Sequence, residues 1–438
     1  MVSFRPIGLA DSFSKILEKI ILGRLQWLTK SQDWLSPDQH GFRSGKSTET
    51  AVHSLVTGIE NGFSAKEVTA CAFLDIKSAF DSAWHPAIVT ALFNKSCPIY
   101  LIKIIHDFLT GRKAVLTTHG ISITIPVNLG CPQGGVLSPF LWIVLIDDIL
   151  RLSFPFPYKI LAFADDLTIS TTHPSPSQAC LNLQIMCDSV NQKLRDIKLN
   201  LNALKTVLMI FSKRRTKLPK FTLIVNGNQI HPSETATLLG FIMDPQLKWT
   251  YHIKAKCVSA KRALFAVNNC IRNSWGSDHN KLRFLYTTAV EPILTYGCAI
   301  WVSALKRKAI VKQLRSFQRT VGLLLTKSFK TASTESIILL ANITPIDHVI
   351  IRNAAYRLLY CNRDDHFTPS SYQFLNNSLP ELAIKEKSEK SESPFSGSLP
   401  PWDFGFHISF LPKHIVVQVP KHIVDYCHQM RIQLMFTL

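Results

Sequence analysis

Two stretches of the sequence place carboxylates at the ends of apolar segments. Residues 161–170, LAFADDLTIS, carry the adjacent pair Asp165 and Asp166, and residues 73–81, FLDIKSAFD, carry Asp75. Like charges close together are unfavourable unless a cation lies between them, and three carboxylates form the oxygen-only ligand set that suits Mg²⁺. Two such ions roughly 4 Å apart would hold both the attacking and the leaving oxygen of a phosphoryl transfer. The pattern therefore predicts the chemistry of a nucleotide polymerase.

The flanking residues decide between this site and an ordinary surface turn, because adjacent aspartates are common on solvated turns. Apolar residues alternate before and after Asp165 and Asp166, which is typical of a half-buried β-hairpin with the pair at its tip. A rival pair, Asp147 and Asp148, ends an apolar stretch that follows Pro139. We interpret that pair as structural, at the end of a buried helix.

Composition limits the classes of partner and location. A chain of 438 residues should divide into two or three subdomains. The net charge of +19 indicates a polyanionic partner, for which nucleic acid is the simplest choice and an anionic membrane surface the alternative. The sequence lacks an apolar run of 18 residues and a signal-peptide core, so we expect an intracellular protein of the nucleus or cytoplasm. The 10 cysteines lack zinc spacing and are expected to be reduced thiols.

The apolar pattern predicts the elements that position these residues. We expect a sheet of the split βαβ type with helices on one face. In the first helix, the apolar side should contain Ile16, Leu17, Ile20, Ile21 and Leu25. Residues 1–30 should begin with an Arg-Pro entry and continue as this amphipathic helix. Further helices are expected in a segment beginning near Thr48, in 85–110, in a segment after Ser138 and Pro139, and in 176–197. The expected strands cover 68–82, a hairpin over 112–130, and segments near 205–212, 220–226 and 236–243.

The region from about 252 to 362 has a helical and strongly basic pattern. Within 251–330, fifteen Lys and Arg residues stand against only two acidic residues. A single basic helix face is usually just solvated, but an imbalance over this length favours contact with phosphates. Lys306, Arg307 and Lys308 are the densest cluster and are the candidates for nucleic-acid binding.

A loop at 41–48, GFRSGKST, ends like a phosphate-binding loop. Its first glycine is one residue too close and no strand precedes it, so an ATPase is excluded. Arg43 and Lys46 remain candidates to contact a triphosphate, since both precede a helix. Solvated cations on a turn are the equally simple alternative.

A second loop at 132–139, PQGGVLSP, combines glycines with a polar amide. Gly134 would let the backbone approach a flat ligand, and Gln133 could hydrogen-bond a base or a sugar. The same segment also predicts a helix start, with Ser138 as N-cap and Pro139 at the first helical position.

Three further residues are candidates with ordinary structural alternatives. Phe80 could stack under an incoming sugar and exclude a 2′-hydroxyl, although a lone aromatic is more often a core residue. Asp81 is expected to stabilise the local fold instead of binding a metal ion. Lys205 lies before an expected strand, where it could assist the pyrophosphate leaving group or simply face solvent.

Taken together and in order, these motifs resemble the reverse transcriptase of non-LTR (LINE-type, jockey-like) retrotransposons. The resemblance covers about residues 1–245 and continues through 289–301, which is similar to the thumb region of that family. The segments that carry it are 4–7 (FRPI), 39–43 (QHGFR), 73–81, 130–139 (GCPQGGVLSP), 163–166 (FADD), 202–206 (NALKT) and 238–241 (LLGF).

The resemblance implies an α+β right-hand polymerase. It would consist of partial fingers over 1–67, a ferredoxin-like palm over 68–250, a basic helical thumb or connection over 251–382, and a linker and tail over 383–438. Family members usually carry an endonuclease and more fingers sequence, so the chain looks like a fragment of a longer element product.

The resemblance also implies roles. The three carboxylates described first would be the catalytic, metal-binding residues, and Phe80 would discriminate between sugars. Gln133 and Gly134 would line the nucleotide and template pocket, and the turn at Leu239 and Gly240 would grip the primer.

The expected activity is RNA-directed DNA polymerisation. An RNA template, a DNA primer and dNTPs would be the partners, with two Mg²⁺ ions, or Mn²⁺ in their place, as cofactors. Neither a membrane nor an obligate protein partner is expected. A decayed retrotransposon fragment that only binds nucleic acid is the alternative, and an intron-maturase-type enzyme is a nearer rival whose maturase segment is missing.

Overall fold

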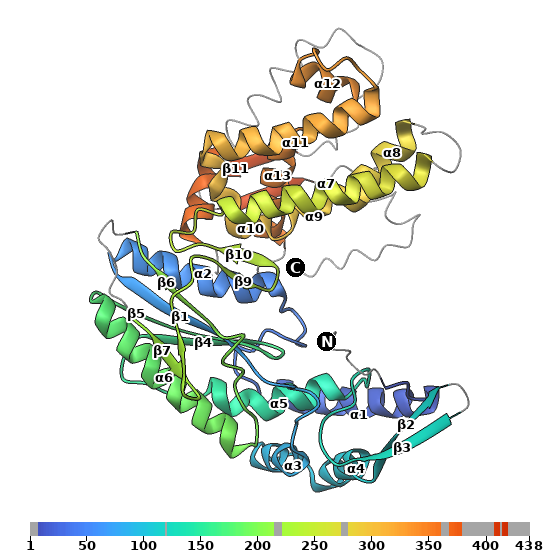
Figure 1. Cartoon of the computed structure of the whole chain (residues 1–438), viewed down its shortest axis with the longest axis vertical. Coiled ribbons are helices and arrows are strands. Elements are labelled where there is room, and N and C mark those ends of the chain that lie inside the picture. The colour runs from blue at the N-terminus through green and yellow to red at the C-terminus, as the bar shows by residue number, and fades with distance from the viewer. Residues whose placement is uncertain are drawn as a thin grey trace.

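The computed structural model describes residues 8–118, 121–213, 221–272, 279–360, 368–378, 407–411 and 414–418. Helices and strands mix along this part of the chain, which confirms the expected α+β class (Figure 1). The motif at 4–7, the expected linker at 383–400 and most of the tail lie outside the described residues.

A four-stranded antiparallel sheet forms the centre of the fold. Its strands are β1 (Val68–Asp75), β4 (Tyr158–Phe163), β5 (Asp166–His173) and β6 (Val207–Phe211). They lie in the order β4-β5-β1-β6, and every neighbouring pair is antiparallel. With helices between β1 and β4 and between β5 and β6, this is the ferredoxin-like order that was expected.

The prediction of a strand over 68–82 was wrong at its end, because β1 stops at Asp75. Residues 77–82 form turns, and Ser78 has a φ of 49°. A left-handed residue cannot continue an extended strand. The turn brings the chain back beside the end of the sheet, where the candidate residues lie.

Helices cover both faces of the sheet, so the prediction of helices on one face was wrong. α5 (Ser138–Leu150) and α6 (Pro176–Asp196) cover one face, and α2 (Thr48–Ser64) covers the other (Figure 1). Successive residues of β1 enter two separate cores: Leu74 packs with α5 and α6, and Phe73 packs with α2. Because β1 is apolar on both sides, both sides must be shielded from water.

The first helix, α1 (Ser12–Gln32), buries a different stripe from the one predicted. Its buried residues are Glu18, Ile21, Leu25 and Leu28. Three of the residues expected on the apolar side are instead exposed by more than half, namely Ile16, Leu17 and Ile20. Of the predicted apolar side, only Ile21 and Leu25 are buried in the core.

The expected helical segment at 85–110 is broken into two helices. α3 (His85–Asn94) and α4 (Ile99–Leu109) are separated by a turn that ends at Pro98. Proline lacks the N–H that a continuous helix requires at that position. The predicted hairpin follows as β2 (Arg112–Thr118) and β3 (Ile121–Val127) and is confirmed.

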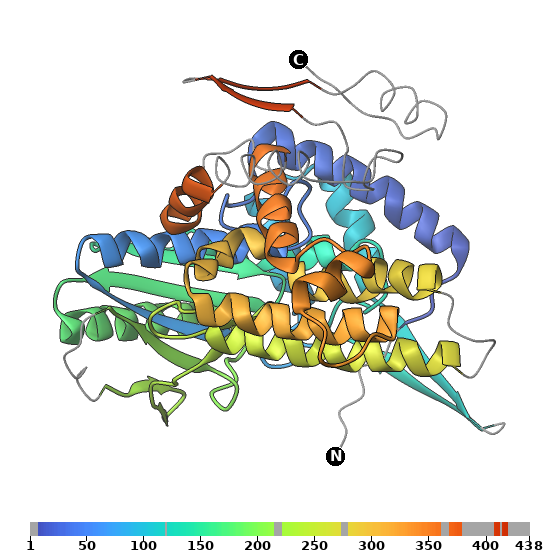
Figure 2. The same ribbon diagram turned by 90° about the horizontal axis from the view of Figure 1, so that it is seen from above.

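The residues described between 250 and 360 form a helical region, as expected. It lies above the sheet with α2, β9 (Ala236–Leu238) and β10 (Phe241–Met243) at the junction (Figure 1). Its long helices α7 (Thr250–Arg272) and α11 (Lys308–Thr326) run side by side (Figure 2). Its elements are α7 (Thr250–Arg272), α8 (His279–Leu285), the π-helix η1 (Tyr286–Val290), α9 (Glu291–Thr295), α10 (Cys298–Trp301), the 3₁₀-helix η2 (Val302–Lys306), α11 (Lys308–Thr326), α12 (Thr334–Leu340) and α13 (Ile346–Tyr360).

Short strands complete the fold. β9 and β10 contribute to the second hydrophobic core, which contains Phe73 of β1. α2 and the helices between 250 and 360 share this core. The strands are β7 (Leu223–Val225), β8 (Asn228–Ile230), β9 (Ala236–Leu238), β10 (Phe241–Met243), β11 (His407–Leu411) and β12 (His414–Gln418).

The cysteines were expected to be reduced thiols. All seven cysteines whose side chains the structure describes are free and buried.

None of the helices in the described ranges is by itself long and apolar enough to cross a membrane. A bent pair, His279–Thr295 with Cys298–Lys306 at 49°, meets the length and composition only when taken together.

A buried histidine makes the stability of the second core depend on pH. His252 is fully buried, and its Nδ1 accepts a hydrogen bond of 3.2 Å from the Ile242 N–H. Burial, with a smaller contribution from Lys256, lowers the pKa of His252 from 6.5 to about 3. In the unfolded chain the ring would bind a proton below pH 6.5, whereas in the folded chain it would not. Folding stability is therefore lost as the pH falls below 6.5.

We expect the free energy of unfolding to fall by up to about 1.4 kcal/mol for each pH unit below 6.5. Denaturant unfolding at pH 7.5, 6.5 and 5.5 measures this slope. His252→Phe should remove this part of the pH dependence whatever its own stability. An unchanged slope in that variant would contradict the assignment.

Candidate active site

The sheet brings the predicted carboxylates to one end. Asp75 is the last residue of β1 and lies directly opposite Asp166, the first residue of β5. Asp165 precedes it in the turn after β4, where Ala164 has a φ of 58°. Residues directly opposite on antiparallel strands have Cα atoms roughly 4.5–5.5 Å apart. The predicted hairpin and its juxtaposition with the first strand are therefore confirmed.

The carboxylate of Asp75 contacts residues at the entrance to β6. Its Oδ2 accepts a hydrogen bond of 3.0 Å from Asn202 Nδ2 and lies 3.8 Å from Lys205 Nζ. The backbone repeats the link, because the Asn202 N–H donates to the Asp75 carbonyl at 2.8 Å. The predicted cation Lys205 thus lies at the carboxylates. Asn202 was not a candidate, although it begins the NALKT motif.

The donor set fits Mg²⁺ in kind, since it contains only carboxylate oxygens at the end of two paired strands. The side chains do not gather into a closed site: among the described residues, there is no cluster of three His, Cys, Asp or Glu side chains that could hold a metal. Asp75 is held by Asn202 and Lys205 instead. Strand register therefore supports the predicted site, whereas side-chain positions do not by themselves form a three-ligand site.

Two neighbours fix the turn that carries Asp165. The indole Nε1 of Trp142 in α5 donates to the Ala164 carbonyl at 2.9 Å. On the other side, Gly41 approaches so closely that a Cβ there would lie 2.3 Å from the Ala164 nitrogen. The loop before Gly41 runs along β4, where the His40 N–H donates to the Ala162 carbonyl at 2.8 Å. The carboxylate turn is therefore held by backbone contacts rather than left as a mobile surface turn.

Phe80 lies in an aromatic cluster beside this turn. Its ring centroid is 5.3 Å from that of Trp142, and Phe42 approaches edge-on at 6.3 Å. The ring is partly buried and packs against the main core. The core interpretation of Phe80 is thus correct in part, and its role toward a sugar stays a prediction.

The loop at 130–137 joins the turn after β1. Gly130 and Cys131 donate their N–H groups to the carbonyls of Ala83 and Phe80, each at 2.8 Å. The Gln133 Nε2 donates to Asp81 Oδ1 at 2.8 Å. Asp81 therefore serves the local fold, as interpreted, and Gln133 uses one amide donor within the protein.

The start of α5 differs from the prediction. Gly134 takes the left-handed conformation with a φ of 99°. Ser138 is not the N-cap, because the helix already includes it and Leu137 occupies the cap position. Its hydroxyl is buried without a hydrogen-bond partner in the described structure. Pro139 is the second residue of α5 rather than the first, so the prediction for it was wrong by one residue, although it lies in the first turn.

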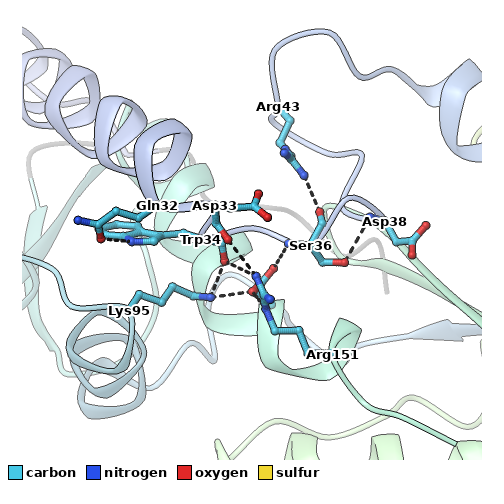
Figure 3. Close-up of polar contacts among 9 residues, drawn as sticks. Gln32, Asp33, Trp34, Ser36, Asp38, Arg43, Lys95 and Arg151 are labelled. Carbon is cyan, nitrogen blue, oxygen red and sulfur yellow. Dashed lines mark hydrogen bonds and ion pairs between the residues drawn. The ribbon is translucent and has the colours of Figure 1, made fainter. Parts of the chain in front are cut away.

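The loop that resembled a phosphate-binding loop caps α2. Ser47 and Thr50 form a reciprocal capping box at the start of that helix. Arg43 donates from Nη1 to the Ser36 carbonyl, so its guanidinium points toward its own loop (Figure 3). Lys46 is partly exposed. Rejection of an ATPase is consistent with this geometry, and contact of either cation with a triphosphate stays a prediction.

The rival pair is structural, as interpreted. Asp147 is fully buried and accepts from Lys95 Nζ at 2.6 Å, from Arg151 Nε at 2.7 Å and from the Ser36 N–H at 2.7 Å (Figure 3). The hydrogen bond to Asp147 raises the pKa of Arg151. Asp148 is exposed.

The turn between β9 and β10 is a tight hairpin turn. Leu239 and Gly240 have φ values of 49° and 80°, and two left-handed residues in succession are typical of a type I′ turn. The Leu239 carbonyl accepts a hydrogen bond of 2.9 Å from Tyr296 Oη, which also lies 3.0 Å from Thr48 Oγ1. Tyr296, which was not a candidate, thus ties this turn to α2 and to the helical region.

The basic cluster at the start of α11 divides into two kinds of residue. Lys306 and Lys308 are exposed. Arg307 is half-buried and donates from Nη1 to Thr250 Oγ1 at 3.2 Å, and burial lowers its pKa. Two of the three predicted phosphate contacts therefore face solvent, while Arg307 also joins α11 to α7.

Comparisons with known proteins give consistent matches. Residues 1–243 match the family model described as reverse transcriptase (RNA-dependent DNA polymerase). A 115 kDa protein of the type-1 retrotransposable element R1DM in Drosophila melanogaster is 26% identical over 79% of this chain and 33% of the relative. The RNA-directed DNA polymerase from mobile element jockey, also of Drosophila melanogaster, is 29% identical over 73% of this chain and 36% of the relative.

The chain spans about a third of the length of these curated relatives. Among solved structures, telomerase from Candida tropicalis in complex with a TWJ fragment of telomeric RNA aligns with a TM-score of 0.41. That alignment has 12% identity and covers 83% of this chain and 56% of the telomerase chain.

Proposed function

The chain belongs to the reverse transcriptase (RNA-dependent DNA polymerase) family, as its motifs predicted, and on that premise we propose that it extends a DNA primer on an RNA template. The observation that carries the proposal is the pairing of Asp75 with Asp166 at the end of the central sheet, next to Asp165. Relatives named as RNA-directed DNA polymerases of non-LTR elements support the same activity.

The test is primer extension on a poly(A) template with an oligo(dT) primer and dTTP. Extension should require Mg²⁺, with Mn²⁺ as a substitute, and should stop when EDTA is added. A reaction without the RNA template measures the background incorporation. Binding of template and primer without any extension would favour the alternative of a decayed, binding-only fragment, against which the three retained carboxylates argue.

The residues have distinct proposed roles. Asp75, Asp165 and Asp166 would hold the two metal ions, which when bound supply charge stabilisation at the phosphoryl group and lower the pKa of the primer hydroxyl. Lys205, which lies 3.8 Å from Asp75, supplies a positive charge for the leaving pyrophosphate. Phe80 limits the space at the sugar. Gln133 lies on a turn that would contact the nucleotide, and its side-chain amide donates a hydrogen bond to Asp81.

The proposed subdomains follow the expected boundaries: fingers at 1–67, palm at 68–250 and thumb or connection at 251–382. Arg43 and Lys46 lie on the fingers loop before α2, from which they would approach a triphosphate. The β9–β10 turn at Leu239 and Gly240 would contact the primer, and the basic helices beyond 250 would bind the phosphates of the duplex.

The exposed lysines at the start of α11 give a direct test of phosphate binding. Each phosphate contact contributes a slope of roughly −0.7 to −0.9 to the plot of log binding constant against log salt concentration. The double variant Lys306→Gln/Lys308→Gln should therefore flatten the salt slope by about 1.5 units, without changing template sequence preference. Fluorescence anisotropy of a labelled template–primer at several salt concentrations measures it.

A matched control removes the same charge elsewhere. Lys15 and Lys19 are exposed on α1, so Lys15→Gln/Lys19→Gln changes the net charge equally. The control should keep the wild-type slope. Equal flattening in both double variants would show a general charge effect and remove the start of α11 from the binding surface.

A further inference from the structure

A carboxylate occupies a core position of α1. The buried residues of this helix recur at helical spacing as Glu18, Ile21, Leu25 and Leu28, and Glu18 is only 3% exposed. A buried carboxylate is unfavourable unless a partner compensates it. An apolar residue would fit this stripe without such a requirement, so the position of Glu18 calls for a partner that depends on its charge or its oxygen atoms.

The partner is the turn that begins α5. Glu18 Oε2 accepts a hydrogen bond of 2.9 Å from the Leu137 N–H, across 119 residues of sequence. Leu137 is the N-cap residue of α5, and that helix has no side-chain cap of its own. The N–H groups at a helix start lack partners within the helix and carry partial positive charge. Glu18 therefore supplies from another helix the acceptor that a capping side chain would normally provide.

Gly135 leaves room for this contact. A Cβ at Gly135 would lie 3.1 Å from Glu18 Oε2 and 2.8 Å from Ser138 Oγ. A larger residue would push the carboxylate away from Leu137. Gly135, the neighbour of the candidate Gly134, thus admits the carboxylate of α1.

The anchored turn is continuous with the candidate active site. Two residues before Gly135, Gln133 donates to Asp81 in the turn after β1. Trp142, the fifth residue of α5, packs against Phe80 and donates to the Ala164 carbonyl beside Asp165. The start of α5 therefore sets the position of the turn at 132–137 and helps to position the turn that carries Asp165.

We propose that Glu18 is a positioning residue for nucleotide binding, acting through the Leu137 N–H to hold the turn at 132–137 in place. The proposal rests on the proposed polymerase function. Glu18 is buried on α1 and does not itself contact the substrate. Its loss should weaken nucleotide binding more than it slows the chemical step.

Glu18→Leu separates this role from a merely structural one. Leucine completes the apolar stripe of α1 and removes a buried carboxylate, but it leaves the Leu137 N–H without an acceptor. The two effects oppose each other, so thermal unfolding should stay within a few degrees of the wild-type temperature. The KM for dNTP should nevertheless rise about tenfold, with kcat changed less than threefold. Glu18→Gln retains an oxygen that accepts the Leu137 N–H and should bring the KM back to within about threefold of wild type.

A control on the same helix has the opposite signature. Leu25 is fully buried, and its apolar side chain cannot accept a hydrogen bond from the Leu137 N–H. Leu25→Ala should therefore lower the unfolding temperature by several degrees and leave the KM unchanged. A KM increase in Leu25→Ala equal to that in Glu18→Leu would overturn the proposal. An unchanged KM in Glu18→Leu would also overturn it.

Amide hydrogen exchange of the peptide spanning 131–141 gives a readout independent of activity. Glu18→Leu should speed exchange at Leu137, and Glu18→Gln should not. Wild-type protein that fails to extend a primer would count against the proposed function, while this exchange result would still test the turn. Exchange in Glu18→Leu as slow as in wild type would overturn the anchoring role.

Discussion

Asp165→Asn is expected to lower nucleotide incorporation by about a thousandfold while leaving template–primer binding close to wild type. Asparagine keeps the size of the side chain but removes the negative charge that a bound metal requires. Metal ions contribute several kcal/mol of charge stabilisation in such reactions, and each 1.4 kcal/mol or so is a factor of ten in rate. On the proposed function, affinity for nucleic acid should come mainly from Lys and Arg contacts elsewhere, so binding should persist.

Asp148→Asn is the matched control. It makes the same chemical change in the rival pair, at an exposed residue of α5. Single-turnover incorporation and anisotropy binding should be measured on both variants, and the control should behave like wild type. Parallel losses of binding and incorporation in Asp165→Asn would count against a catalytic role for this carboxylate.

Phe80→Ala is expected to admit ribonucleotides. The ring lies between Trp142 and Phe42 at the turn after β1, so its removal opens space beside the carboxylates. Steric discrimination of this kind is typically about 10- to 200-fold. We therefore expect Phe80→Ala to lower the preference for dNTP over rNTP by a factor in that range. Competing incorporation of dTTP and UTP by one primer–template measures the ratio.

Phe42→Ala removes the edge-on neighbour and leaves Phe80 in place. Phe42 is 51% exposed, so this control should lose little stability and retain the sugar preference. A dNTP preference in Phe80→Ala equal to that of wild type would make Phe80 a packing residue alone. Equal relaxation in both variants would assign discrimination to the aromatic cluster rather than to Phe80.

Hydrophobic pattern alone was enough to predict the local elements around the carboxylates. Alternating apolar residues on both sides of Asp165 and Asp166 predicted a hairpin, and β4 and β5 form it. The buried helix ending near Asp147 was equally clear from its continuous apolar run. Such features depend on neighbours within a few residues, and hydrophobic periodicity encodes them directly. Local pattern could not place the end of β1, because the left-handed Ser78 lacks a glycine signal.

Which of these elements contact one another depends on long-range packing. The pairing of Asp75 with Asp166 depends on strand register, and the contact with Asn202 joins residues 127 positions apart. The hydrogen bond between Glu18 and Leu137 is likewise long-range, and in the sequence Glu18 reads as one more polar residue of an amphipathic helix. Periodicity assigns a residue to a face but does not say what that face contacts. Those contacts come from packing the whole chain, which also covered the second face of the sheet with α2.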